Sequence, residues 1–356
     1  MNIRSLPKVS LHDHLDGALR PETIIELARA RSVSLPSHNA AELAEWFTRS
    51  AGSGSLDSYL ATFAVTLSVL QTEAALRRVA SEYVHDLHDD GVIYGEVRWA
   101  PEQHQEAGLS LDDAVRAVAK GIADAEASIR KAGGDIRVTQ ILCAMRQGSR
   151  SQEIAALAIR HRDRGVVAFD IAGPEAGFPA SGHREAFDLL ATSLMPVTVH
   201  AGEADGVESI RSAIHDGRAL RLGHGVRIAE DIDIDSQDDE NTYVRLGRLA
   251  EWVKDREIAL ELCPTSNLQT DAWGTELRDH PFDLLYQLGF RVTVSCDNRL
   301  MSGTTLTREL SELCDTFAYG IDDLEVFQLN AAAAAFLPAD ERARLAVTIS
   351  EAFERL

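Results

Sequence analysis

Short apolar runs alternate with amphipathic segments along most of this chain, and this alternation limits the possible folds more than any other feature. Eight runs have the length of a buried strand. Most are followed by segments with apolar residues at positions i, i+3 and i+4, the spacing of a helix, such as 111–129, 152–160 and 242–253. The eight strand candidates are residues 9–11, 92–97, 136–143, 166–171, 196–199, 219–222, 258–262 and 292–294.

Strands that alternate with helices form parallel sheets with crossover helices. Eight such units in 356 residues predict an α/β fold, a (β/α)8 TIM-type barrel, as one domain over residues 1–356. Extra helices are expected after the first strand, within residues 20–90, and two or three more at the C-terminus, after residue 303. The acidic segment 231–240 is expected to be a solvated loop or the start of a helix.

Polar residues stand where five of the strand candidates end. In a barrel of this type the functional groups lie at the carboxyl ends of the strands. A single histidine there is often an ordinary core or surface side chain, but the coincidence at five strand ends argues against that alternative. The residues are His12, His14, Asp170, His200, Glu203, His224 and Asp297.

His12 and His14 are two positions apart, so on a strand both rings face the same side. With a third imidazole from His200 and a carboxylate, they form the donor set that Zn²⁺ prefers. Glu203 lies three residues beyond His200, where a carboxylate can shuttle protons beside a metal; the alternative is a solvated carboxylate that caps a helix. His224 stands between two glycines, which lets its ring approach a ligand closely; the alternative is a turn histidine.

The charge balance narrows the range of partners. The net charge is -21, from 35 basic and 56 acidic side chains, and a field of this sign repels phosphate backbones and anionic lipids. We therefore expect a small neutral or cationic substrate, and neither nucleic acid nor a membrane as a partner. The four cysteines are widely spaced without a C-x-x-C pair, which indicates a reducing cytoplasm.

Seven short motifs, weak individually, are highly specific in their order and spacing. They are His-Asp-His-Leu-Asp-Gly at 12–17, Gly-Glu-Val-Arg at 95–98, Asp-Ile-Ala-Gly-Pro-Glu at 170–175, His-Ala-Gly-Glu at 200–203, Gly-His-Gly at 223–225, Cys-Pro-Thr-Ser-Asn at 263–267 and Asp-Asn-Arg at 297–299. From about Pro7 to about Leu337 the chain resembles the adenosine deaminases of the amidohydrolase superfamily.

This resemblance implies zinc-dependent hydrolytic deamination of adenosine and 2′-deoxyadenosine to the 6-oxo purine, with release of ammonia, in purine salvage. Glu203 would donate a proton to purine N1, and His224 and Asp297 would orient the attacking water. One zinc ion per chain would be held by His12, His14, His200 and Asp297.

The resemblance also implies the substrate contacts. The Gly173 backbone N–H would meet purine N3, Asp16 would accept a hydrogen bond from a ribose hydroxyl, and His14 would lie beside the substrate. Asn298 would contact purine N7, although many relatives carry Asp there; an Asn amide can donate without being protonated. Pro174 also stands where an Asp is common. Apolar residues that would cover the pocket are Leu56, Tyr59, Phe63 and Met145, although their spacing alone also suits a protein core.

Other functions remain open at this stage. The same chemistry could serve free adenine or a modified nucleoside such as aminodeoxyfutalosine. The same barrel could hydrolyse an amide or a phosphoester, since fold alone does not decide function. A third alternative is a binding protein that descends from a deaminase and has lost its activity. Such a protein is expected to lose the metal set or Glu203 first, and this chain has both. The zinc deaminases with H-x-E and P-C-x-x-C signatures do not fit this chain. The sequence is compatible with a monomer or a homodimer.

Overall fold

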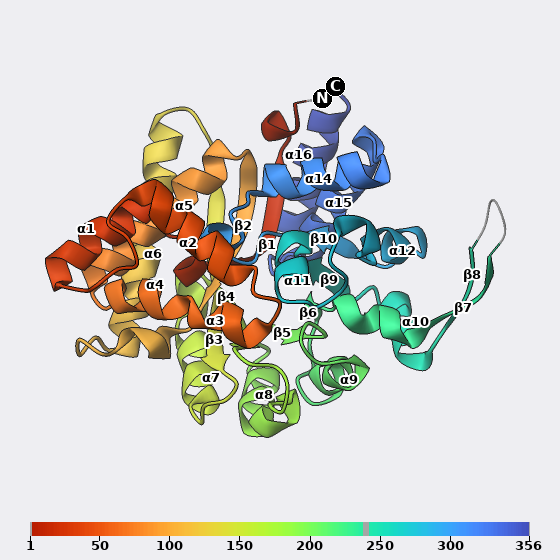
Figure 1. Ribbon diagram of the computed structural model, residues 1–356, viewed down its shortest axis with the longest axis horizontal. Helices are drawn as coiled ribbons and strands as arrows, with labels where there is room; N and C mark the ends of the chain where they lie inside the picture. Colours follow the sequence, from red (N-terminus) through yellow and green to blue (C-terminus); the bar gives the residue numbers. More distant parts are fainter. Residues whose placement is uncertain (1, 238–241, 356) are drawn as a thin grey trace.

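Eight parallel strands pair side by side in a closed circuit (Figure 1). The computed structural model describes residues 2–237 and 242–355. One sheet has the order β1-β2-β3-β4 and the other β10-β9-β6-β5. Bridges between Phe169 and Val197 and between Asp13 and Asp297 join the two sheets at both edges, which closes the predicted (β/α)8 barrel. The barrel strands are β1 (Lys8–His14), β2 (Val92–Trp99), β3 (Arg137–Met145), β4 (Val166–Ala172), β5 (Thr198–Ala201), β6 (Arg221–His224), β9 (Ala259–Leu262) and β10 (Val292–Val294).

Each of the eight strand candidates overlaps one strand of the barrel, because each is a mainly apolar run that the barrel largely buries. The predicted helices at 111–129 and 152–160 are also confirmed. The first begins at Leu111 because the Ser110 side chain accepts a hydrogen bond from the Asp113 backbone N–H. The helices that follow the strands are α6 (Leu111–Lys131), α7 (Ser151–Arg160), α8 (Arg184–Thr192), α9 (Val207–His215), α10 (Arg248–Asp255), α11 (Pro264–Gln269), α12 (Phe282–Gln287) and α13 (Arg299–Ser302).

Extra helices occupy the two expected positions, after β1 and at the C-terminus. Those after β1 are α1 (Pro21–Arg31), α2 (Ala40–Ala51), α3 (Leu56–Ala61), α4 (Phe63–Val69) and α5 (Glu73–Asp89). Those at the C-terminus are α14 (Leu306–Phe317), α15 (Ile321–Ala334) and α16 (Ala339–Phe353). Within residues 2–237 and 242–355 no single helix is long and apolar enough to cross a membrane, although the bent pair Leu56–Val69 and Glu73–Asp89 together reach that length and composition.

The predictions for segments 231–240 and 242–253 were wrong in part. Two antiparallel strands, β7 (Ile232–Gln237) and β8 (Thr242–Leu246), form a hairpin that projects from the barrel, and α10 begins only at Arg248 (Figure 1). Isoleucine and aspartate alternate at 232–235, which is the period of a strand and not of a helix. Residues 238–240 lie outside the described residues.

A chain of buried charges crosses the inside of the barrel beneath the strand ends. Glu261 pairs with Arg98 at 2.6 Å and with Arg221 at 2.6 Å, and Arg221 pairs with Glu96 at 2.6 Å. None of these side chains is more than 1% exposed. The C-terminal segment joins this chain, because the Phe336 backbone N–H donates to Glu96. The polar interior therefore connects the base of the barrel with the residues at its carboxyl end.

Candidate active site

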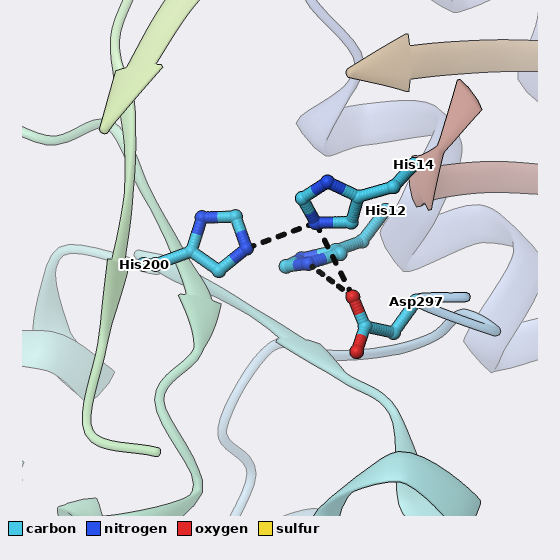
Figure 2. A group of neighbouring side chains, drawn as sticks. All are labelled: His12, His14, His200 and Asp297. Carbon is cyan, nitrogen blue, oxygen red and sulfur yellow. Dashed lines mark hydrogen bonds and ion pairs between the residues drawn. The ribbon is translucent and has the colours of Figure 1, made fainter. Parts of the chain in front are cut away.

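Three histidines and one aspartate meet at the carboxyl end of the barrel (Figure 2). His12 and His14 reach the centre from β1, His200 from β5 and Asp297 from the segment after β10. Their ligand atoms all lie within 4.8 Å of one another, and all four residues are buried. The structure thus brings together the whole set that the sequence predicted.

These side chains suit a zinc ion. The His14 and His200 Nε2 atoms lie 3.1 Å apart, and Asp297 Oδ1 lies 3.3 Å from His14 Nε2 and 3.5 Å from His12 Nε2. His12 Nε2 is buried and has no hydrogen-bond partner in the described part of the chain. Burial lowers the pKa of His200 to about 4, although Asp170 opposes this, so the ring is neutral and can coordinate. Three imidazoles and a carboxylate are a donor set typical of Zn²⁺.

Two buried carboxylates orient the histidines from behind. Glu261 Oε2 lies 2.8 Å from His12 Nδ1, and Asp170 Oδ2 lies 2.8 Å from His200 Nδ1. Arg98 donates to both carboxylates, at 2.6 Å to Glu261 and 2.8 Å to Asp170. A carboxylate in this position selects the tautomer that leaves Nε2 free for a metal.

Asp170 was among the polar residues predicted at strand ends, but Glu261 was not. The available signal was a single glutamate within the apolar run 258–262. A buried charged residue needs a partner, and one partner of Glu261 is His12, a member of the predicted metal-binding set.

Glu203 and His224 lie beside the cluster. His224 Nε2 is 3.5 Å from Glu203 Oε2, and the two residues are 1% and 4% exposed. Burial raises the pKa of Glu203 well above its usual range, and the Asp297 and Glu175 carboxylates add to the effect. Burial lowers the pKa of His224 well below its usual value, and His12 adds to that. The raised pKa of Glu203 favours its protonated carboxyl form, and the lowered pKa of His224 favours its neutral imidazole.

The orientation of His224 is set by Asn267. Its amide Nδ2 lies 3.0 Å from His224 Nδ1, while its Oδ1 lies 3.2 Å from His280 Nε2 and accepts from the Cys263 backbone N–H at 3.3 Å. Because the oxygen faces donors, the amide nitrogen donates to Nδ1, and the His224 proton resides on Nε2, toward the cavity. Backbone strain accompanies this placement, since His224 has a φ of 60°.

A cavity of about 410 Å³ opens over the cluster, a size suited to a small molecule. Every residue predicted to contact substrate lines it, namely His14, Asp16, Leu56, Tyr59, Phe63, Met145, Gly173 and Asn298. His200, Glu203, His224 and Asp297 line it as well. The Tyr59 hydroxyl lies 3.0 Å from Ser302 Oγ, and this contact holds the side chain in place in the cavity lining. Lining residues that sequence reasoning did not assign include Leu67, Gln103, Cys143 and Gln147.

Three buried oxygen atoms of the cavity lining have no hydrogen-bond partner among the described residues: Asp16 Oδ1, Asn298 Oδ1 and Glu203 Oε1. Buried polar atoms are normally paired, so these atoms indicate a polar ligand. Asn298 can approach the site only because residue 17 is glycine, since a Cβ there would lie 1.9 Å from Asn298 Oδ1.

Comparisons with known proteins agree with this geometry. A family model described as "Adenosine deaminase" matches residues 7–352. The chain is 52% identical to adenosine deaminase of Mycobacteroides abscessus over 96% of this chain and 93% of that protein. It is 52% identical to adenosine deaminase 1 of Streptomyces coelicolor over 96% and 85% of the two chains.

Solved structures with the same fold are more distant in sequence. Adenine deaminase from Arthrobacter aurescens has a TM-score of 0.82 at 23% identity, over 97% of this chain and 98% of that one. An amidohydrolase from Burkhoderia ambifaria with bound Zn has a TM-score of 0.81 at 22% identity, over 99% of this chain and 92% of that one. At this identity the likeness is one of fold.

Proposed function

The chain belongs to the adenosine deaminase family, and we propose that its three histidines and Asp297 hold the catalytic zinc ion. The chain catalyses the metal-dependent hydrolytic deamination of adenosine, which yields inosine and ammonia. One observation carries the assignment of the site: Glu203, whose pKa is raised by burial, lies in the same buried cavity as a zinc donor set. The proposed ligands are His12, His14, His200 and Asp297.

The reaction centre is C6 of the purine, an aromatic carbon that resists addition. Zinc, when bound, supplies Lewis-acid activation of water at neutral pH. Glu203 donates a proton to purine N1, so that the ring accepts electrons as the water attacks. The raised pKa of Glu203 supports this role, because the acid must be protonated when the substrate arrives. A positioned acid contributes about 10²–10⁴-fold to the rate.

His224 and Asp297 orient the attacking water. The contact of His224 with Asn267 supports this role, because it directs Nε2 toward the cavity. The lowered pKa of His224 supports it as well, because it favours the neutral imidazole. Asp297 is held in turn by the Ser266 hydroxyl, which donates to Oδ2 at 2.6 Å and leaves Oδ1 toward the metal ligands. Ammonia then leaves from C6, and the 6-oxo purine remains.

The remaining pocket residues select the nucleoside. The Gly173 N–H meets N3, Asn298 contacts N7 and Asp16 accepts a ribose hydroxyl, with 2′-deoxyadenosine as a further substrate. His14 lies beside the bound substrate. The unpartnered oxygen of Asp16 supports its contact with a ribose hydroxyl, because a free acceptor needs a donor. Apolar side chains exclude water above the ring, namely Leu56, Tyr59, Phe63 and Met145.

We also propose a cytoplasmic enzyme that works as a monomer or a homodimer, with residues 1–356 acting as one catalytic domain. All four cysteines are free, which supports a reducing compartment.

The test combines metal removal with a variant of Glu203. Purified protein should hold about one zinc ion per chain, and a chelator should abolish ammonia release from adenosine. Glu203→Gln should keep the zinc and lose at least about 10²-fold in kcat. Glu208→Gln, which removes an exposed carboxylate five positions further along, should be unchanged. An active preparation free of metal would refute the zinc assignment, and a normal rate for Glu203→Gln would refute the role of Glu203.

A further inference from the structure

One buried carboxylate outside the proposed catalytic set holds the loop that carries Glu203. Glu175 follows β4 and is 3% exposed. Its Oε2 accepts hydrogen bonds from three consecutive backbone N–H groups, those of Glu203 at 3.0 Å, Ala204 at 2.6 Å and Asp205 at 3.0 Å. Its Oε1 accepts from the Gly202 backbone N–H at 2.6 Å and from the Ser209 hydroxyl.

The loop curls around this carboxylate because Gly202 adopts a left-handed conformation with a φ of 75°. A Cβ at position 202 would lie 2.6 Å from Ile210 Cδ1, so a larger residue would displace the Ile210 side chain as well as strain the backbone. Successive N–H groups that converge in this way form an anion-binding concavity. Here the anion is the Glu175 carboxylate. Because it is buried, these N–H donors replace the water that would otherwise solvate it.

A second side chain, from the residue after β3, holds the same region. Arg146 is 2% exposed, and it donates to the His200 carbonyl at 2.9 Å and to the Phe178 carbonyl at 2.8 Å. The loop after β4 is therefore tied to the loop after β5 by Glu175 and to the end of β5 by Arg146. These loops carry Gly173 and Glu203, which the proposed function assigns to N3 and N1, the two nitrogens on either side of purine C2.

We propose that Glu175 is a positioning residue for deamination, which fixes the main chain at 202–205 so that the Glu203 carboxyl group faces purine N1. This inference rests on the proposed role of Glu203. A purely structural role for Glu175 would be to accept hydrogen bonds from the backbone N–H groups that precede α9. The two roles differ in one respect: a positioning residue that acts through Glu203 has nothing left to contribute once Glu203 has lost its function.

The experiment is a double-mutant cycle, measured as ammonia release from adenosine by the zinc-loaded full-length enzyme. We expect Glu175→Gln to lower kcat by about 10²-fold, because a displacement of the order of 1 Å has that effect. We expect KM to change by less than about threefold and the zinc content not to change. In a Glu203→Gln background the same substitution should have no further effect on kcat. The matched control is Glu126→Gln, which removes a carboxylate that accepts the Val138 backbone N–H at 2.8 Å, away from the cavity.

Two results would overturn the inference: a kcat for Glu175→Gln within about threefold of the wild-type value, or an equally large further loss in the Glu203→Gln background. A wild-type enzyme without activity, or a fully active Glu203→Gln, would instead refute the proposed function itself.

Hydrogen exchange provides a measurement that does not depend on the folding of Glu175→Gln. In the wild-type enzyme the amides of Gly202, Ala204 and Asp205 should exchange at least about 10²-fold more slowly than an unstructured chain. In Ser209→Ala, which removes one donor to Glu175 but keeps its carboxylate, that protection should persist. Unprotected amides in the wild-type loop would overturn the inference.

Discussion

Glu261 provides the sharpest test of the buried network behind the metal ligands. Its Oε2 accepts from Arg98 at 2.6 Å and lies 2.8 Å from His12 Nδ1, and its Oε1 accepts from Arg221 at 2.6 Å. Glu261→Gln preserves the shape of the side chain but removes its charge. The amide oxygen can accept from only one of the two arginines, so the amide N–H₂ faces the donors of the other.

The magnitude follows from what each partner retains. Breaking a buried ion pair costs about 3–5 kcal/mol when a charge is left uncompensated. Here Arg98 keeps Asp170 at 2.8 Å and Arg221 keeps Glu96 at 2.6 Å. We therefore expect the lower end, a loss of about 3 kcal/mol in the free energy of unfolding of the metal-free protein. Loss of the carboxylate behind His12 should also weaken zinc binding by about 10–100-fold.

The effect should depend on pH. Burial opposes ionisation of Glu261, but Arg98 and Arg221 hold its pKa well below the usual value of 4.5. A carboxylate with a depressed pKa in the folded state stabilises the protein above its unfolded-state pKa, and this contribution is lost as the pH falls through the folded-state pKa. The difference between wild type and Glu261→Gln should therefore be full at neutral pH and narrow below about pH 4.5.

The assays are urea unfolding of the metal-free proteins and zinc competition with a chelator. The matched control is Glu257→Gln, four positions earlier, where a 68% exposed side chain pairs with Arg291 at 2.7 Å. A surface pair of this kind is worth less than about 1 kcal/mol. A loss for Glu261→Gln as small as that of the control, with unchanged zinc affinity, would refute the reasoning.

Two further substitutions test other parts of the structure. Burial raises the pKa of Glu309 from 4.5 to about 7, so the folded protein retains a proton over that range and its stability falls as the pH rises through it. Glu309→Gln should therefore gain up to about 3 kcal/mol relative to wild type between pH 4 and pH 8 in urea unfolding, and a constant difference would contradict this. Gly17→Ala should displace Asn298 and raise KM for adenosine by about tenfold with zinc retained. Gly52→Ala is the control, because its Cβ would lie 3.6 Å from the nearest atom, and an unchanged KM for Gly17→Ala would contradict the predicted clash.

The hairpin shows where a local pattern was misinterpreted. Residues 242–253 were assigned to one helix, but Thr242–Leu246 form a strand opposite Ile232–Gln237. Over a window as short as residues 242–246, apolar spacing does not distinguish a strand from the first turn of a helix, so the pattern was ambiguous. The partner's own period of two at 232–235 was the better signal.

The sequence by itself determined the eight strands, the barrel and the residues at its carboxyl end. Each of these depends on near neighbours: an apolar run specifies a buried strand, and parallel strands deliver the residues that follow them to one face. Only the tertiary structure decided which carboxylate lies behind each functional group. Glu261 and His12 are 249 positions apart, and Glu175 contacts residues 202–205 from the neighbouring loop. Such contacts depend on the stagger with which the barrel closes, which no local pattern of residues encodes.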